Sequence, residues 1–332
     1  MQVLVTGGAG FLGRYIVDLL LERGYRVRIF QRSDAPDLAQ RGVEIVRGSL
    51  SDVDSVQRAV MGCDAVFHVA AKAGVWGRRA DYFKVNLEGT RAVIDACRTS
   101  GVKWLIYTST PSVVFNGDSF RGEDEELPYG HDWLCHYAES KAEAEAVALA
   151  ANAVGGLQVC ALRPHLIWGV GDPHLLPRVM ERARAGKLRI VGDGKNRVDI
   201  THVRNAAAAH IAALDALGRG KAGGRAFFIS QGEPVVLWEW INELLSRVGV
   251  PRVEGKIAYP VARRIGSILE RAWSLFRIQG EPPMTRFVAT ELAKDHWYSI
   301  EAARVELGYE PERFSTEAGL EEFVAVYLKK RK

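Results

Sequence analysis

The stretch that decides the fold of this chain reads Val3-Leu-Val-Thr-Gly-Gly-Ala-Gly-Phe-Leu-Gly13. Its apolar beginning predicts a short buried strand, and Gly7, Gly10 and Gly13 then follow at steps of three residues. A helical pattern starts after the third glycine, and a second strand is expected over residues 25–30. Such a glycine turn lets the backbone approach a pyrophosphate closely, while the following helix N-terminus offers free N–H groups. The stretch therefore predicts a dinucleotide-binding βαβ unit.

Length and composition predict a soluble globular protein with one large domain and a smaller partner, since 332 residues exceed what one compact core usually supports. A net charge of +4 gives no indication of nucleic-acid binding. The four scattered cysteines indicate reduced thiols, and no histidine shows metal-ligand spacing, so no metal site is expected. The chain enters a strand at once and has no run of about 18 apolar residues, so we expect neither a signal peptide nor a membrane-spanning helix.

Strands and helices alternate along the first half of the chain, which predicts a doubly wound parallel sheet, the α/β Rossmann fold. Further strands are expected over residues 43–46, 64–71, 104–108, 159–163 and 226–230. The last of them is expected to return to the main sheet. Between these strands, the acidic residues 116–133 are expected to form an irregular loop.

The pattern changes after residue 165, and from residue 231 it is mostly helical. This change predicts a second, smaller and mostly helical unit that covers the substrate. We assign residues 1–165 and 197–230 to the dinucleotide-binding domain, and residues 166–196 and 231–328 to the substrate-binding and lid domain.

Residue 31 bears on which dinucleotide is preferred. An acid after the second strand of this fold binds the ribose hydroxyls of adenosine and selects NAD. Gln31 stands in that place and does not repel a phosphate, and the next residue, Arg32, can pair with one. The alternative for Arg32 is a solvated loop arginine. The pair favours NADP(H) as the cofactor.

Polar residues follow the fourth and fifth strands at their carboxyl ends, where ligands of such sheets bind. Ser109 and Thr110 come directly after residues 104–108 and are placed to polarise a substrate. Lys72 and Trp76 lie in a loop after the fourth strand and are either ligand contacts or surface residues. His68 lies inside the apolar strand itself, which favours a hydrogen-bonded core histidine over a ligand.

Tyr137 and Lys141 are four residues apart at the start of an Ala/Glu-rich helical pattern, so they share one helix face. An ammonium group near a phenol favours the phenolate, so we expect Lys141 to lower the pKa of Tyr137. A tyrosine tuned in this way can exchange a proton with an alcohol or a ketone. The alternative is a chance surface pair, which the glycine turn and the hydroxyl-rich strand end make less attractive.

With the glycine turn and the Tyr-x-x-x-Lys segment, the chain resembles the extended short-chain dehydrogenases/reductases over nearly its whole length. The resemblance implies a doubly wound sheet in which Tyr137 is the acid/base and Lys141 holds the nicotinamide ribose. It also implies that a hydroxyl binds the substrate oxygen, which by position is Thr110, with Ser109 as the close alternative.

The same resemblance implies a set of cofactor-binding residues. Asn86 matches an asparagine of the family's Val-Asn-x-x-Gly-Thr segment, and Pro164 matches a proline beside the nicotinamide. Many members carry Asp where this chain has Ser49, although Leu50 and Asp52 match, which leaves the adenine contact open. The implied set is Gly7, Gly10, Phe11, Leu12, Gly13, Gln31, Arg32, Leu50, Asp52, Ala70, Lys72, Asn86, Tyr137, Lys141 and Pro164.

Three segments resemble more narrowly the 3β-hydroxysteroid dehydrogenase branch, namely residues 71–77, 107–114 and 296–304. Within that branch, residues 163–169 and 283–287 resemble the bacterial reductases of long-chain olefin hydrocarbon biosynthesis. The implied reaction is the NADPH-dependent reduction of a 2-alkyl-3-oxoalkanoate, a β-keto acid with two long alkyl chains, to the 2-alkyl-3-hydroxyalkanoate. The implied setting is the cytoplasm, as a homo-oligomer or in a complex with other enzymes of that pathway.

Other functions are compatible with parts of the pattern. The nearest is a 3β-hydroxysteroid or sterol dehydrogenase that uses the same chemistry. A sugar-nucleotide epimerase is disfavoured by the long apolar, arginine-studded segments of the C-terminal half. A non-catalytic dinucleotide sensor or scaffold is disfavoured because both Tyr137 and Lys141 are present.

Residues 259–278 show an apolar stripe at helical spacing, interrupted or flanked by arginines. One interpretation is an ordinary helix that packs its stripe on the core. A second is a lid whose apolar face covers alkyl chains of the substrate. A third is a helix that docks on a membrane surface or a partner, which would place the protein at the periphery of a membrane.

Overall fold

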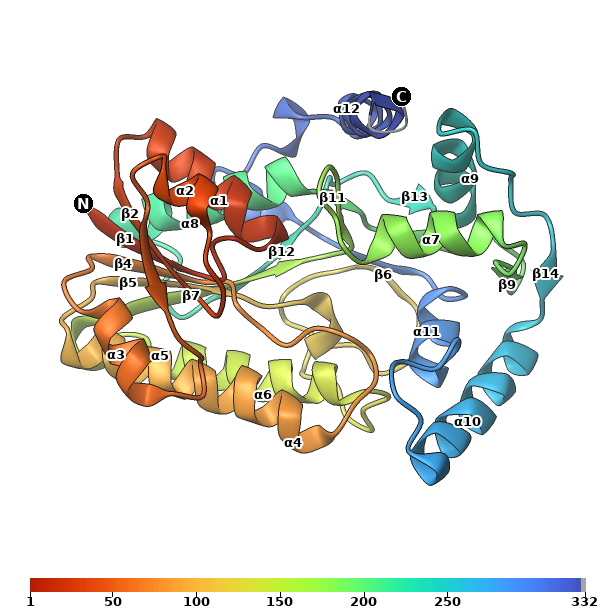
Figure 1. The fold of residues 1–332 in the computed structure, drawn as a ribbon, viewed down its shortest axis with the longest axis horizontal. Coiled ribbons are helices and arrows are strands. Elements are labelled where there is room, and N and C mark those ends of the chain that lie inside the picture. The colour runs from red at the N-terminus through yellow and green to blue at the C-terminus, as the bar shows by residue number, and fades with distance from the viewer. Residues whose placement is uncertain (330–332) are drawn as a thin grey trace.

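The computed structural model describes residues 1–329, and a parallel seven-stranded sheet lies at its centre, in the order β12-β7-β5-β4-β1-β2-β3 (Figure 1). Every pair of neighbouring strands in this sheet is parallel. The strands are β1 (Gln2–Thr6), β2 (Arg26–Gln31), β3 (Glu44–Arg47), β4 (Ala65–His68), β5 (Trp104–Thr108), β7 (Gln158–Pro164) and β12 (Ala226–Ile229). The predicted doubly wound α/β fold is thereby confirmed, and residues 226–229 return to the main sheet as expected.

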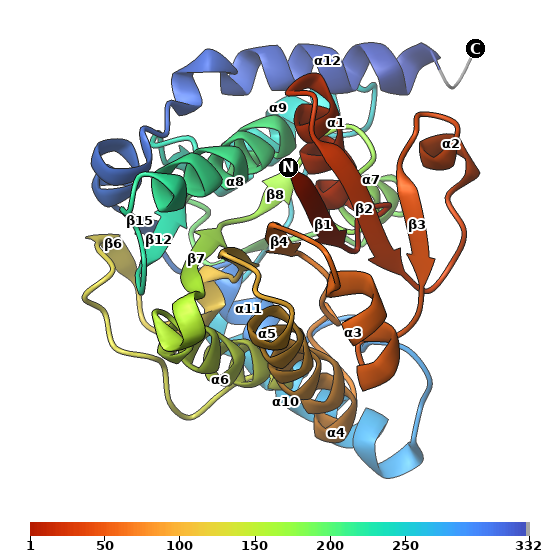
Figure 2. The same cartoon turned by 90° about the vertical axis from the view of Figure 1, so that its left-hand side faces the viewer.

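Helices cover both faces of the sheet (Figure 2). One face carries α1 (Phe11–Glu22) and α8 (Val203–Gly218), which pack against each other. The other face carries α3 (Val53–Val60), α5 (Gly89–Thr99) and α6 (His136–Ala150). Because both faces are covered, the strands are apolar on both sides, as is usual for parallel sheets.

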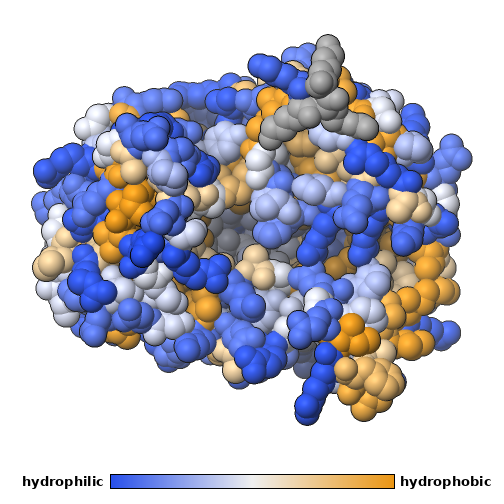
Figure 3. Space-filling view, in the orientation of Figure 1, coloured by the Kyte–Doolittle hydropathy of each residue, from blue (hydrophilic) through white to orange (hydrophobic). Residues whose placement is uncertain are grey.

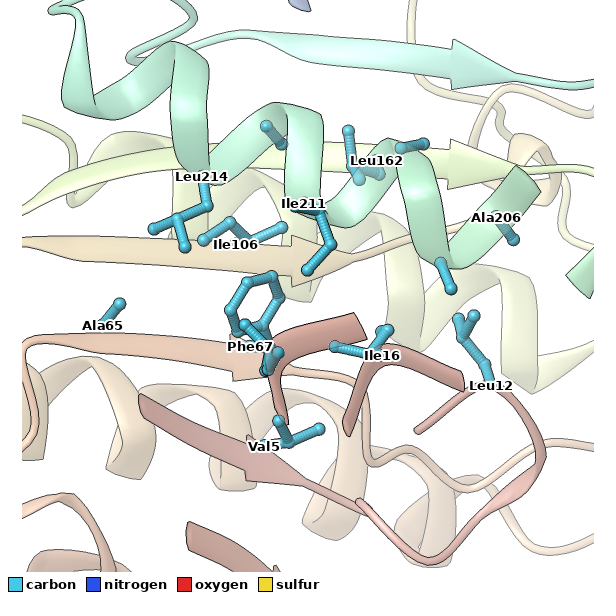
Figure 4. Close-up of a cluster of buried hydrophobic side chains, with 14 of the residues drawn as sticks. Val5, Leu12, Ile16, Ala65, Phe67, Ile106, Leu162, Ala206, Ile211 and Leu214 are labelled. Carbon is cyan, nitrogen blue, oxygen red and sulfur yellow. The ribbon is translucent and has the colours of Figure 1, made fainter. Parts of the chain in front are cut away.

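Alternation along each strand sends neighbouring residues to opposite faces. Val5 and Phe67 belong to the cluster under α1 and α8, and Figure 4 shows Phe67 between Val5 and Ile211. Their chain neighbours Leu4 and Val66 belong to the cluster under α3, α5 and α6. The two buried clusters fix the register of the sheet, because a slip by one residue would exchange the faces of every side chain.

The order of the strands reverses between β1 and β4. From β1 the chain winds outward through β2 and β3, and it then crosses to β4 and continues through β5, β7 and β12. Ligands of open parallel sheets bind outside the carboxyl ends of the strands at this switch point. The glycine turn that follows β1 lies there.

The rest of the chain builds a smaller lobe with its own buried cluster, which includes Trp168, Trp238 and Leu244. Its helices are α7 (Leu175–Arg184), α9 (Leu237–Arg247), α10 (Tyr259–Phe276), α11 (Arg286–Glu291) and α12 (Thr316–Lys329). A four-stranded sheet in the order β13-β10-β15-β6 joins β6 (Phe120–Glu123), β10 (Arg197–Val198), β13 (Val235–Val236) and β15 (His296–Tyr298). Two small parallel pairs complete it, β8 (Ile167–Trp168) with β11 (Thr201–His202) and β9 (Ile190–Val191) with β14 (Lys256–Ile257).

The acidic segment 116–133 differs from its expected irregular conformation. Residues 120–123 form β6, which pairs in parallel with β15, about 175 residues later in the chain. No local pattern in the segment predicts this strand, since its backbone partners become available only when the C-terminal region folds back. The fourth strand likewise ends at His68, three residues earlier than predicted, because residues 69–71 leave the sheet to form the rim of the crevice.

The division into two domains stays a prediction. Ile300, Ala303 and Leu307 belong to the buried cluster under α1 and α8, although they lie in the stretch assigned to the smaller domain. The C-terminal α12 contributes Leu320 and Phe323 to the cluster of the smaller lobe. The C-terminal part of the chain therefore contributes to both buried clusters, whereas the predicted division assigns all of it to the smaller domain.

Residues 259–276 form α10, but the interpretation of an ordinary helix packed through its apolar stripe is wrong. The buried residues of α10 are Ala262, Gly266 and Glu270, and large residues of the stripe such as Ile268 and Leu275 are exposed. Within residues 1–329, no helix is both long enough and apolar enough to cross a bilayer. All four cysteines are buried and free, in agreement with the expected reduced thiols.

Candidate active site

The glycine turn between β1 and α1 has no room for side chains. The N–H of Gly10 donates a 2.8 Å hydrogen bond to the carbonyl of Gly7, whose φ of +69° suits glycine. A Cβ at Gly13 would lie 2.2 Å from that carbonyl oxygen, and one at Gly7 would lie 3.2 Å from Ala70. The first turn of α1 contains no acidic residue, so no carboxylate at this helix N-terminus would repel a phosphate.

A chain of hydrogen bonds joins β1 to β4 below this turn. Thr6 Oγ1 accepts from the backbone N–H groups of Val69 and Ala70, each at 3.1 Å, so its own hydroxyl donates to His68 Nδ1 at 2.8 Å. His68 Nε2 lies 3.0 Å from Thr90 Oγ1. Burial lowers the pKa of His68 to about 3, so the ring is neutral. The predicted hydrogen-bonded core histidine is confirmed.

Asn86 connects the loop after β4 to α6. It lies in a π-helical turn, Phe83–Glu88, between the short helix α4 (Arg79–Tyr82) and α5. Its Oδ1 accepts from the backbone N–H of Lys72 at 2.7 Å, and its Nδ2 donates to the carbonyl of Lys72 at 3.0 Å and to Ser140 Oγ at 2.9 Å. Ser140 lies on α6 between Tyr137 and Lys141, so Asn86 holds the rim loop beside that pair.

At the end of β2, Gln31 reaches back to the glycine turn. Its Oε1 accepts from the backbone N–H of Ala9 at 3.0 Å. Arg32 is exposed, and no carboxylate within residues 1–329 pairs with it. Sequence reasoning overlooked Arg14, whose Nε donates to the carbonyl of Ala9 at 3.1 Å and whose guanidinium pairs with Asp37. Its position directly after Gly13 was the available signal.

The predicted adenine contacts have structural roles of their own. Leu50 is buried in the cluster under α3 and α5. Asp52 is the N-cap of α3, and its Oδ1 accepts from the backbone N–H of Ser55 at 3.3 Å. Phe11 and Leu12 form the first turn of α1. All of these residues lie near the carboxyl ends of β1 to β3, which is where the resemblance expects them.

Tyr137 and Thr110 come together at the carboxyl end of β5. Thr110 is the N-cap of a 3₁₀ turn, Pro111–Val113, and its hydroxyl donates to Ser112 Oγ at 3.2 Å. The Thr110 side chain also lies near the Tyr137 phenol, and it acts to lower the pKa of that phenol. Burial is the larger effect and raises the pKa of Tyr137 to about 12. The hydroxyl of Ser109 is buried and, among the described residues, has no hydrogen-bond partner. Thr110, and not Ser109, is therefore the hydroxyl residue that acts on the Tyr137 phenol.

Lys141 is buried one turn after Tyr137 on α6. Its Nζ donates to the carbonyl of Thr108 at 2.6 Å and lies 4.1 Å from the centre of the Tyr107 ring. Burial lowers the pKa of Lys141 to about 7, against the opposing effect of the Glu145 carboxylate.

The expected lowering of the Tyr137 pKa by Lys141 is wrong for the protein alone. Burial is the largest effect on the phenol and raises its pKa, while the Thr110 side chain lowers it by less. The ammonium of Lys141 donates to the carbonyl of Thr108 instead. The physical reason is that Lys141 is directed at the end of β5, and that desolvation of the phenolate outweighs a hydrogen bond. Tyr137 is therefore protonated at neutral pH.

Pro164 ends β7 and is buried beside the end of β12. The next residue, His165, donates through Nε2 to His296 Nδ1 at 2.7 Å, since His296 Nε2 donates to the carbonyl of Glu291. The ligand atoms of His165, Glu291 and His296 lie within 4.8 Å of one another, a grouping that sequence spacing did not predict. One hydrogen bond between the rings and one from His296 to the backbone carbonyl of Glu291 hold these residues together.

A further contact closes the rim of the crevice. The Glu281 carboxylate accepts from the backbone N–H of Val75 at 3.1 Å and pairs with Arg178 of α7 at 2.7 Å. It thereby connects the loop that holds Lys72 and Trp76 to the smaller lobe. Sequence reasoning did not identify Glu281, because nothing near it in the chain indicates a partner about 200 residues earlier.

These residues fit a nicotinamide dinucleotide. Any Cβ would fill the turn at Gly7 and Gly13, and the helix N-terminus beyond it carries no acid. The protonated phenol of Tyr137 and the hydroxyl of Thr110 lie at the carboxyl end of β5. The site can therefore bind a pyrophosphate at one end and move a proton at the other.

Comparisons with known proteins agree with this reading. The sequence profile of the 3-beta hydroxysteroid dehydrogenase/isomerase family matches residues 4–260. The chain is 51% identical to a 2-alkyl-3-oxoalkanoate reductase of Stenotrophomonas maltophilia over 96% of this chain and 97% of that one. It is 44% identical to the Shewanella oneidensis protein of the same name, over 93% and 82% of the two chains. Among solved structures, MoeE5 in complex with UDP-glucose and NAD superposes with a TM-score of 0.77 at 25% identity, covering 100% and 99% of the chains.

Proposed function

Because this chain belongs to the 3-beta hydroxysteroid dehydrogenase/isomerase family, we propose that it is an NADPH-dependent reductase of 2-alkyl-3-oxoalkanoates. Its relatives are named reductases and dehydrogenases, so the chain is an oxidoreductase that uses a nicotinamide dinucleotide. The proposed product is the 2-alkyl-3-hydroxyalkanoate. The observation that carries the proposal is the pairing of Tyr137 with Thr110 at the end of β5, in a chain about half identical to a reductase of that name.

The proposed chemistry divides between cofactor and protein. The bound nicotinamide supplies a hydride to the carbonyl carbon of the substrate. Tyr137 donates its phenolic proton to the carbonyl oxygen, and its raised pKa keeps that proton in place until it is needed. Thr110 orients the same oxygen through its hydroxyl.

Lys141 has a positioning role in this proposal. Its buried amine donates to the carbonyl of Thr108, and we propose that it also binds a ribose hydroxyl of the nicotinamide nucleotide. With a pKa of about 7, it can gain or lose a proton near neutral pH, which suits a group that resupplies Tyr137 through a ribose hydroxyl.

The preference for NADP(H) is also a proposal. Gln31 places an amide, not a carboxylate, beside the glycine turn, and Arg32 is free to meet a 2′-phosphate. Arg14 lies at the same turn and can join it, after leaving Asp37. Two guanidinium groups near the adenosine ribose would favour the phosphorylated cofactor.

The substrate distinguishes this function from its alternatives. We would follow NADPH oxidation with 2-alkyl-3-oxo acids of increasing alkyl length, and NAD(P)⁺ reduction with 3β-hydroxysterols and with UDP-glucose. The proposal expects turnover with the keto acids, well above that with the other classes. A higher kcat/KM for a 3β-hydroxysterol would instead make the protein a sterol dehydrogenase.

The proposed homo-oligomer, or complex with other olefin-pathway enzymes in the cytoplasm, would be sought by size-exclusion chromatography of the untagged protein.

A further inference from the structure

The outer face of α10 carries an unusual concentration of exposed apolar side chains. Thirteen large apolar residues are exposed within residues 1–329, and six of them fall in residues 261–278. Figure 3 shows apolar side chains gathered at the lower right of the molecule, where Figure 1 places α10. Ile268, Leu275 and Phe276 expose 64%, 76% and 72% of their surface. Single exposed apolar residues are common, but a contiguous group marks an interaction surface.

The opposite face of the same helix explains why α10 does not need these residues for folding. A Cβ at Gly266 would lie 2.6 Å from the backbone of Thr285, so the helix packs closely on the start of α11. The buried Glu270 accepts from the backbone N–H of Arg286 at 2.7 Å and pairs with its Nε at 2.6 Å. The inner face therefore attaches the helix through small and polar residues, and the apolar residues point outward.

Arginines run alongside this apolar ridge. Val261, Ile268 and Leu275 are seven residues apart and form one row, and Arg264 and Arg271 form a parallel row one turn earlier. Neither of these arginines pairs with a carboxylate within residues 1–329, and the same holds for Arg263 and Arg277. The only acid in residues 259–278 is Glu270, which is buried and paired. The outer face is thus apolar and cationic, with no negative charge.

We propose that the outer face of α10 docks on the surface of an anionic lipid bilayer. An amphipathic helix with arginines beside its apolar row lies in the interface, where lipid phosphates meet the guanidinium groups and the apolar residues enter the acyl boundary. A second copy of the chain is a poorer occupant, because a two-fold pairing would bring the same unpaired arginines together. The inference does not depend on which keto acid the protein reduces.

The full-length protein would be sedimented with vesicles of phosphatidylcholine alone and of phosphatidylcholine mixed with phosphatidylglycerol. We expect binding to the anionic vesicles and its loss at high salt. Arg264→Gln with Arg271→Gln should lower the partition coefficient of the protein onto the anionic vesicles by about fivefold per arginine. Ile268→Ser with Leu275→Ser should weaken it by at least about tenfold.

Matched controls keep the test specific. Val305→Ser removes an equally exposed apolar residue elsewhere, and Arg219→Gln removes an exposed arginine at the end of α8. Both should bind like the unchanged protein, and all variants should keep its unfolding temperature. Equal binding to neutral and anionic vesicles would overturn the proposal. So would α10 variants that change the oligomeric state in size-exclusion chromatography while vesicle binding persists.

Discussion

Gln31 Oε1 accepts a hydrogen bond of 3.0 Å from the backbone N–H of Ala9, so the side chain that ends β2 is tied to the glycine turn after β1. An acid in this place would bring a negative charge to the adenosine ribose. The amide brings none, and the neighbouring Arg32 is left exposed and without a carboxylate partner among residues 1–329.

Arg32→Ala should weaken NADPH binding by about 1.5–3 kcal/mol, the range for hydrogen bonds to charged groups. NADH binding should hardly change, because NADH lacks the phosphate that the guanidinium would meet. Titration of both cofactors by tryptophan fluorescence would measure this. An equal loss for NADH and NADPH would refute the assignment of Arg32.

Tyr137→Phe keeps the ring and removes the proton, so turnover should fall by at least ~10²-fold while cofactor binding survives. Steady-state kinetics with a 2-alkyl-3-oxo acid, together with NADPH titration, would separate the two effects. Near-normal turnover of this variant would remove Tyr137 from the mechanism.

Thr110→Val should reduce kcat more strongly than Ser109→Ala, because the side chain of Thr110 lies near enough to Tyr137 to act on the pKa of its phenol, whereas the buried hydroxyl of Ser109 has no hydrogen-bond partner among residues 1–329. The loss for Thr110→Val should be of the order of 10²-fold, as for removal of one oriented hydrogen-bond donor. Comparing kcat for the two variants decides between them. A larger loss of kcat for Ser109→Ala than for Thr110→Val would indicate that Ser109, and not Thr110, binds the substrate oxygen.

Glu145→Ala should destabilise the fold by about 3–5 kcal/mol, because it leaves a buried charge without its partner. Glu145 and Arg163 are both buried, 2.6 Å apart, and Tyr129 also donates to the carboxylate at 3.0 Å. Urea unfolding would measure the loss. Glu143→Ala is the control, since that carboxylate is half-exposed and 3.9 Å from Arg79, and its cost should be below about 1 kcal/mol.

Asp199→Asn should change how stability depends on pH. Burial raises the pKa of Asp199 from 3.8 to about 6, so the folded protein binds the extra proton between these values and loses stability as pH rises through them. The asparagine removes this loss, which amounts to up to ~3 kcal/mol. Relative to the unchanged protein, the free energy of unfolding of the variant should therefore be higher at pH 7 than at pH 4. The exposed Asp118→Asn should show no such trend, and a flat difference for Asp199→Asn would contradict the prediction.

Local sequence patterns were sufficient to predict the main sheet and the edge of it at which the candidate site lies. Glycine spacing in residues 7–13 and the apolar strands are local patterns, and the carboxyl ends of parallel strands must share one edge. Tyr137 and Lys141 could be paired from helical spacing alone. These features follow from backbone geometry and side-chain periodicity within short stretches of chain.

Features that depend on partners far away in the chain could not be predicted from local patterns. β6 exists because β15 lies beside it, and Glu281 reaches Val75 across the crevice. The pKa of Tyr137 is raised, not lowered, because burial of the phenol is set by surrounding elements and outweighs what its helix neighbour can offer. The apolar stripe of α10 points outward because Gly266 and Glu270 on its other face fit α11. Periodicity identifies a stripe, but the direction in which it faces depends on which side of the helix finds a complementary surface.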